Sequence, residues 1–221
     1  MNVPLSHIVE AVCTGTARPF NGAELSAIAK YPREERVQVL SHGLAPDEQA
    51  DKRHHGGPDM AVHLYPLNHH TFWREQIGGH ELLEQPGAFG SNLAVTGLTE
   101  DAVHIGDRFR LGPKTSGALV EISQPRKPCW KIEHRFGQKG MVAQIIATGR
   151  CGWYFRVIET GDVAVGDRLE RVSLGDVRWS VERAFFALHA GKASRDDLAE
   201  LAAMPALSAE MRARAAARFA A

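Results

Sequence analysis

A cysteine between cationic residues and prolines is the first feature of this sequence that points to chemistry. Cys129 follows Arg126, Lys127 and Pro128. Positive charge near a thiol favours the thiolate, the form that attacks electrophiles or binds a soft metal ion. Pro125 and Pro128 also restrict the backbone that presents the thiol. The segment therefore predicts a reactive cysteine rather than one that only fills space in the core.

Histidines gather around a pair of glycines earlier in the chain. His54 and His55 precede Gly56 and Gly57, and His63 follows them. Imidazoles can carry protons or bind metals, and glycines let the backbone approach a ligand closely. Zinc is an alternative ligand, but the spacing of these histidines matches neither the HExxH nor the CxxC pattern. The stretch therefore predicts a ligand-binding segment, and its spacing disfavours a zinc site.

A polar, glycine-containing loop is the third candidate feature. Ser91 and Asn92 follow Gly87 and Gly90. Backbone amides in such a loop can surround an anionic group such as a phosphate. A loop of this composition is otherwise a turn, so it supports a site only together with the other two segments.

Composition limits the class of protein to which these segments belong. The 221 residues carry 26 Lys plus Arg and 26 Asp plus Glu, so no net charge draws the chain to nucleic acid or to an anionic membrane. No segment reaches the ~20 apolar residues that cross a bilayer, and the first residues do not resemble a secretion signal. Cys13, Cys129 and Cys151 are too few and too far apart for a disulfide framework. We expect a cytoplasmic protein that binds neither membranes nor nucleic acid polymers.

Short apolar or alternating runs separated by Gly, Pro, Asp and Asn fill residues 7–172, which favours an all-β sandwich or barrel. Residues 119–123 form a predicted strand that ends at Pro125. Residues 103–111 form another strand with a turn or bulge at Gly106, and residues 165–172 repeat its Gly-Asp-Arg phrase.

A hairpin is predicted further along the chain. It would join residues 153–158 to residues 163–165, with Gly161 in a positive-φ conformation.

Helical periodicity identifies the remaining elements. It predicts short helices at about 67–76 and 141–148. After residue 172, apolar spacing from Val181 and capping residues at Ser194 and Ser208 predict three more helices. The sequence thus predicts a β domain over residues 1–172 and a helical domain over residues 173–221.

Taken in order, the motifs resemble the MOSC-domain family, named for the C-terminal domain of molybdenum-cofactor sulfurase, and within it the YiiM-like branch. The resemblance covers nearly the whole chain. The phrases that carry it contain Ser26 to Lys30, Gly43-Leu44, Asp47 to Ala50, His55 to Asp59, His63 with Tyr65-Pro66, Phe89 to Leu93, Gly97-Leu98, Gln124-Pro125-Arg126, Pro128-Cys129 and Gly152-Trp153.

The resemblance implies a mainly β fold, a MOSC-type β-barrel with a small three-helix C-terminal appendage. It also implies a molybdenum cofactor (molybdopterin) and reduction of small N-hydroxylated bases such as 6-hydroxylaminopurine. A separate flavoprotein or ferredoxin would donate the electrons.

Site roles follow from the same resemblance. Lys30, His63 and Cys129 would form the catalytic cluster, with Cys129 as molybdenum ligand or sulfur carrier. The residues assigned to cofactor binding are Arg126, His55, Gly56, Gly57, Ser91 and Asn92. Departures from the family pattern around Thr115 to Ala118 and at Arg53-His54 leave the substrate open.

Two alternatives remain at this point. The chain could carry sulfur as a persulfide on Cys129 without redox chemistry, or it could bind the cofactor without turnover.

Overall fold

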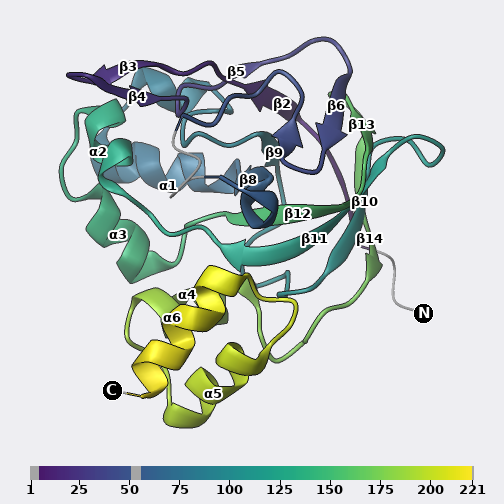
Figure 1. Ribbon diagram of the computed structural model, residues 1–221. Coiled ribbons are helices and arrows are strands. Elements are labelled where there is room, and N and C mark those ends of the chain that lie inside the picture. Colours follow the sequence, from purple (N-terminus) through teal and green to yellow (C-terminus); the bar gives the residue numbers. More distant parts are fainter. Residues whose placement is uncertain (1–4, 51–55, 221) are drawn as a thin grey trace.

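The computed structural model of this chain describes residues 5–50 and 56–220. It shows a sheet-rich body with helices on two sides (Figure 1). Its strands are β1 (Ser6–Ile8), β2 (Ala11–Thr14), β3 (Arg18–Asn21), β4 (Glu24–Ser26), β5 (Tyr31–Pro32), β6 (Val37–Leu40), β7 (Gly43–Leu44), β8 (Val62–Pro66), β9 (Leu93–Val95), β10 (Arg108–Leu111), β11 (Ala118–Pro125), β12 (Trp153–Glu159), β13 (Gly161–Val163) and β14 (Arg168–Ser173). Its α-helices are α1 (Asn68–Ile77), α2 (Trp130–Phe136), α3 (Met141–Thr148), α4 (Val181–His189), α5 (Arg195–Ala203) and α6 (Ala209–Phe219). Short 3₁₀ turns lie at Pro58–Met60 and Glu81–Glu84.

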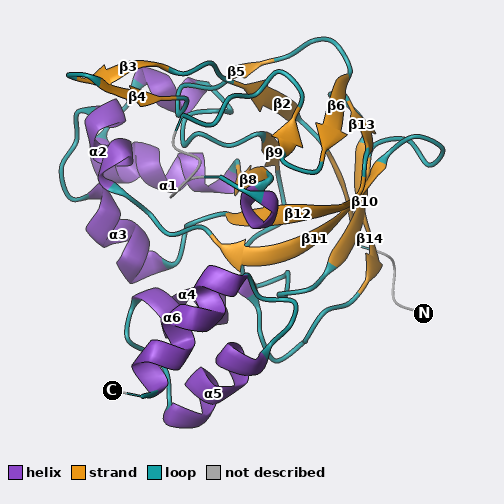
Figure 2. Cartoon of the chain, viewed as in Figure 1, coloured by secondary structure: helices purple, strands orange, loops and turns teal. Residues whose placement is uncertain are grey.

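The main sheet has nine strands in the order β1-β14-β10-β11-β12-β8-β9-β2-β5, and only the pair β8 and β9 is parallel (Figure 2). Two small sheets, β13-β6-β7 and β3-β4, complete the β structure. The predicted mainly β fold is confirmed in this form, as a mixed, sheet-rich fold with helices. The predicted closed barrel is not confirmed, because no pairing among the described residues joins β1 to β5.

The two Gly-Asp-Arg phrases lead into strands that pair with each other. β10 and β14 run antiparallel, with Arg110 opposite Glu170. Gly106 has a φ of +85°, which confirms the predicted turn. The first strand is shorter than predicted, because it begins at Arg108; Val103 and Ile105 are buried in the loop before it.

The predicted hairpin around Gly161 is wrong. β13 pairs with β6, not with β12, and Gly161 lies opposite Val39. Gly161 is not among the positive-φ glycines of the chain. Its lack of a side chain serves close packing instead, since a Cβ there would lie 2.3 Å from the backbone nitrogen of Ala118. The glycine in the sequence therefore marked a close approach to the first residue of β11 rather than a turn.

The helices predicted near residues 67–76 and 141–148 are confirmed as α1 and α3, and the three predicted C-terminal helices as α4, α5 and α6. Ser180, Ser194 and Ser208 accept a backbone hydrogen bond at the N-terminus of α4, α5 and α6 respectively. The sequence did not predict α2, which begins directly after Cys129. No helix of residues 5–50 and 56–220 is long and apolar enough to cross a membrane.

The C-terminal helices lie together beside β11 (Figure 1). One hydrophobic cluster joins sheet residues such as Phe109 and Ile122 to Leu201 and Met211 of these helices. The backbone nitrogen of Ser208 also donates to the carbonyl of Ser123 over 3.0 Å. The division into residues 1–172 and 173–221 stays a prediction, and the core runs across it.

His189, at the end of α4, should make stability depend on pH. Burial, and then the positive charges of Arg214, Lys127 and Arg218, lower the pKa of His189 from 6.5 to about 4. Below pH 6.5 the unfolded chain binds a proton that the folded chain rejects, so stability falls as pH decreases toward 4. This single group should contribute about 3 kcal/mol to the loss.

Urea unfolding of wild type and His189→Gln at pH 7 and pH 4 checks this expectation. The variant should lose less free energy of unfolding between the two pH values than the wild type does. Equal losses would show that His189 titrates normally in the folded protein.

Candidate functional site

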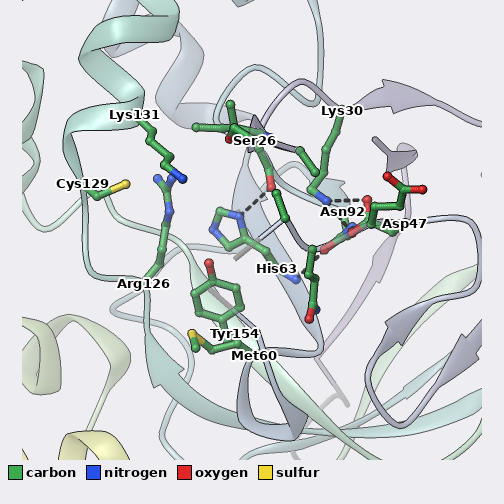
Figure 3. Close-up of a pocket in the computed structure, with 16 residues that line it drawn as sticks. Ser26, Lys30, Asp47, Met60, His63, Asn92, Arg126, Cys129, Lys131 and Tyr154 are labelled. Atoms are coloured by element: carbon green, nitrogen blue, oxygen red, sulfur yellow. Dashed lines mark hydrogen bonds and ion pairs between the residues drawn. The ribbon is translucent and has the colours of Figure 1, made fainter. Parts of the chain in front are cut away.

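A pocket between the β3-β4 hairpin, α2 and the middle of the main sheet brings the predicted segments together (Figure 3). It encloses about 630 Å³, a volume that includes space open to solvent. Its lining residues are Ser26, Ala27, Ile28, Lys30, Asp47, Glu48, Gln49, Ala50, Met60, His63, Gly90, Asn92, Arg126, Cys129, Lys131 and Tyr154. Figure 3 shows Cys129, Arg126 and Lys131 on one side, Lys30 and Asp47 on the other, and His63 with Tyr154 between them.

Lys30 lies on one wall of the pocket and is only 8% exposed. Its Nζ forms an ion pair with the Asp47 carboxylate. Asp47 also accepts hydrogen bonds from Gly15 N at 2.8 Å and from Asn92 Nδ2 at 2.9 Å, which hold the carboxylate in place. Burial lowers the pKa of Lys30, and the negative charge of Asp47 opposes this shift. The pair is therefore a fixed dipole in which much of the lysine charge is already compensated.

His63 lies on β8 at the floor of the pocket and is 2% exposed. Its Nδ1 is 3.3 Å from the carbonyl oxygen of Gly90, which can only accept, so Nδ1 carries the proton. Burial, followed by the positive charge of Arg126, lowers the pKa of His63 well below its usual value. The ring is therefore neutral near pH 7, which favours a positioning role over delivery of a proton by an imidazolium.

Arg126 follows the last residue of β11 and is 6% exposed. Within residues 5–50 and 56–220, its guanidinium forms no ion pair, and its buried Nη1 has no hydrogen-bond partner. A buried cation without a partner is costly, and an anionic ligand would remove that cost. Arg126 is thus the group in the described pocket with free capacity for an anion.

Cys129 is half-buried and immediately precedes α2. Lys127 was expected to share its cationic turn, but it is exposed and outside the pocket lining. Lys131 of α2 lies in the pocket instead, and its Nζ is 2.9 Å from the Glu24 carboxylate of β4. The helix that sequence analysis missed therefore supplies the second cation near the thiol.

Tyr154 on β12 completes the floor, with its ring centroid 4.9 Å from that of His63. Burial raises the pKa of Tyr154, and the nearby Arg126 opposes that shift. The phenol keeps its proton at neutral pH, so it is a possible proton donor within the pocket.

The structure brings together five of the residues that sequence analysis assigned to the site, namely Lys30, His63, Asn92, Arg126 and Cys129. Ser91 is buried outside the pocket and donates to the carbonyl of Pro86 over 3.2 Å. Gly56 and Gly57 do not line the pocket, and His55 lies outside the described residues.

Sequence analysis did not assign Asp47, Tyr154, Lys131, Ser26 or Met60 to the site. Asp47 stood in one of the motif phrases, which was the available signal, and Tyr154 follows the Gly152-Trp153 phrase directly. Lys131 had no signal beyond its closeness to Cys129.

Comparison with known proteins identifies the family of this chain. A model of the MOSC domain matches residues 51–170, and a model described as a YiiM-like, 3-alpha helix domain matches residues 179–220. The solved structure of YiiM from Geobacillus stearothermophilus is 29% identical, with a TM-score of 0.81 over 96% of this chain and 99% of that one.

Relatives in sequence include the uncharacterized protein YflK of Bacillus subtilis (strain 168), 43% identical over 75% of this chain and 72% of that protein. Protein YiiM of Escherichia coli (strain K12) is 39% identical over 73% of this chain and 70% of that protein. A protein of Gibberella moniliformis (strain M3125 / FGSC 7600) named Reductase is 35% identical over 84% of this chain, but the match covers 32% of that protein. With both family matches in chain order and a YiiM structure superposing along nearly its whole length, this chain belongs to the MOSC-domain family and to its YiiM-like members.

Proposed function

We propose that this chain is a molybdenum-cofactor-dependent reductase of N-hydroxylated purines and related small compounds. The observation that carries the proposal is the buried Arg126, which has no ion-pair partner among the described residues and shares a pocket with the half-buried Cys129. A cation and a thiol in one cavity suit a ligand that has both anionic groups and a soft metal. Membership of the MOSC-domain family supports this choice of ligand.

The lining residues fit such a cofactor. Arg126 would bind its anionic groups, Lys131 would add positive charge, and Cys129 would be the molybdenum ligand. When bound, the cofactor would supply the two-electron redox chemistry, and the protein would supply position and electrostatics.

Reduction of an N-hydroxylated base breaks its N–O bond, takes up two electrons and two protons, and releases the amine and water. Tyr154 is protonated at neutral pH, as an ordinary phenol is, and it would donate one of these protons. Neutral His63, 4.9 Å from Tyr154 between ring centroids, would orient the phenol and the substrate. The Lys30–Asp47 pair would fix the opposite wall. In this proposal the residues chosen from the sequence bind and orient, and Tyr154 takes the role of proton donor.

The electrons would come from a separate protein of the flavoprotein or ferredoxin type. Most of the Gibberella relative named Reductase lies outside its match to this chain. That relationship supports a reductase in which the present chain is the substrate-reducing part and a partner supplies electrons.

Cys129→Ala should abolish molybdenum binding, because the variant lacks the proposed metal ligand. Metal analysis and pterin fluorescence on protein purified from a host that makes the cofactor provide the measurement. Wild type should contain close to one molybdenum per chain, the variant almost none.

Cys151→Ala is the matched control, since Cys151 is fully buried and does not line the pocket. It should keep its molybdenum. If wild type lacked molybdenum and pterin but gained the mass of one sulfur atom on Cys129, the persulfide carrier would replace the reductase.

Arg126→Gln should weaken retention of the cofactor without unfolding the protein. Hydrogen bonds to charged groups contribute about 1.5–3 kcal/mol, so the dissociation constant should rise at least tenfold. Pterin release measured by dialysis and fluorescence checks this expectation, with Arg108→Gln as control because Arg108 pairs with Glu121 outside the pocket. Equal release from both variants would argue against Arg126 as the anion ligand.

A further inference from the structure

Glu100 is a buried carboxylate that does not line the pocket. The residue is 4% exposed, and its Oε2 is 2.8 Å from Nε2 of His69 on α1, itself 6% exposed. Its Oε1 accepts a hydrogen bond from the backbone nitrogen of Gly152 over 2.7 Å. One buried carboxylate thus connects α1 to the turn that precedes β12.

Gly152 is the point at which three parts of the candidate site meet. Its carbonyl accepts the backbone N–H of Arg126 over 3.0 Å. Its φ is +69°, and a Cβ there would lie 2.4 Å from the carbonyl oxygen of Leu64 and 2.9 Å from Nε2 of His63. Tyr154 follows two residues later, so a shift of this turn would move Arg126, Tyr154 and the contact with His63 together.

A second chain of hydrogen bonds runs from the same helix to the same turn. Trp73 Nε1 on α1 donates to the hydroxyl of Tyr65 over 2.7 Å. That hydroxyl donates in turn to the carbonyl of Arg150 over 3.4 Å. Two polar connections therefore hold the turn at Arg150 and at Gly152, and only the one through Glu100 is charged.

The charge of Glu100 also acts on the same turn as that of Arg126. Burial raises the pKa of the Cys151 thiol; Glu100 raises it further, and Arg126 lowers it. The two opposite charges therefore both act on Cys151.

We propose that Glu100 is a positioning residue that acts through Gly152 to hold Arg126 and Tyr154 in the geometry that the site uses. The expected effect of Glu100 on turnover rests on the proposed reductase function. Its expected effect on the position of Arg126 is independent of that function. His69 orients the carboxylate so that Oε1 faces Gly152.

Substitutions at Glu100 separate the hydrogen bond from the charge. Glu100→Gln can still accept a hydrogen bond from Gly152 N, and its side-chain amide can donate one to His69. The exchange rates of the Arg126 and Gly152 amide hydrogens in this variant should therefore stay within about threefold of wild type. Glu100→Asp keeps the charge but is one methylene shorter, and Glu100→Leu removes both contacts. In the Glu100→Asp and Glu100→Leu variants, exchange of the Arg126 and Gly152 amide hydrogens should become at least about tenfold faster, as expected when a buried hydrogen bond is lost.

Turnover gives the second readout. Assayed on 6-hydroxylaminopurine with the cofactor-loaded protein, Glu100→Asp should lower kcat by about tenfold or more with a smaller change in KM, as expected when catalytic groups are misplaced. Glu100→Gln should restore most of kcat. If the Leu variant does not fold, the Asp variant alone decides.

Glu121→Leu is the matched control, because Glu121 is 7% exposed and pairs with Arg108 and Arg156 outside the pocket. It should accelerate exchange near its own strand and leave the Arg126 amide protected. Equal exchange at Arg126 in wild type and Glu100→Asp would overturn the proposal, as would a general acceleration that includes the Ile122 amide. If wild type lacks reductase activity, the proposed function fails, and the exchange data still decide the role of Glu100.

Discussion

The antiparallel pairing of β11 with β12 is the constraint on which the candidate site depends. Its register places Pro125 opposite Trp153 and Gln124 opposite Tyr154. On its other edge β12 pairs with β8, with Tyr154 opposite His63. Arg126 leaves β11 where this ladder ends. Because strand side chains alternate between faces, a shift of one residue would move Tyr154 to the other face of the sheet. The sheet register therefore determines which side chains meet in the pocket.

The charges in the pocket are compensated unequally. Lys30 has Asp47 and Lys131 has Glu24 as partners, whereas Arg126 forms no ion pair within the part of the chain that the structure describes. Burial keeps His63 neutral, but a guanidinium stays charged in almost any environment. Of these three cations, Arg126 is thus the one whose charge is not offset by a carboxylate of the described residues.

The sequence was sufficient to predict the elements that are determined by residues close together along the chain. The C-terminal helices could be predicted because Ser194 and Ser208 cap them and apolar residues recur at helical spacing. The pairing of β13 with β6 could not be predicted, because Gly161 avoids a clash with Ala118, a contact made only in the folded sheet. Asp47 was missed as a site residue for a similar reason, since its partners Lys30, Gly15 and Asn92 come from three other segments.

The type of a residue predicts which chemistry it can perform, but burial shifts its pKa and so determines its protonation state. The three cysteines are equivalent by type, yet burial raises the pKa of Cys13 to about 12 and that of Cys151 well above its usual range. Cys129 is the one of the three that lines the pocket, and the sequence singled it out by its cationic neighbours. One of those neighbours, Lys127, turns out to lie outside the pocket, while Lys131 reaches it because a helix begins after the thiol. The cations on the same side of the pocket as Cys129 are therefore Arg126 and Lys131, and the local sequence pointed only to Arg126.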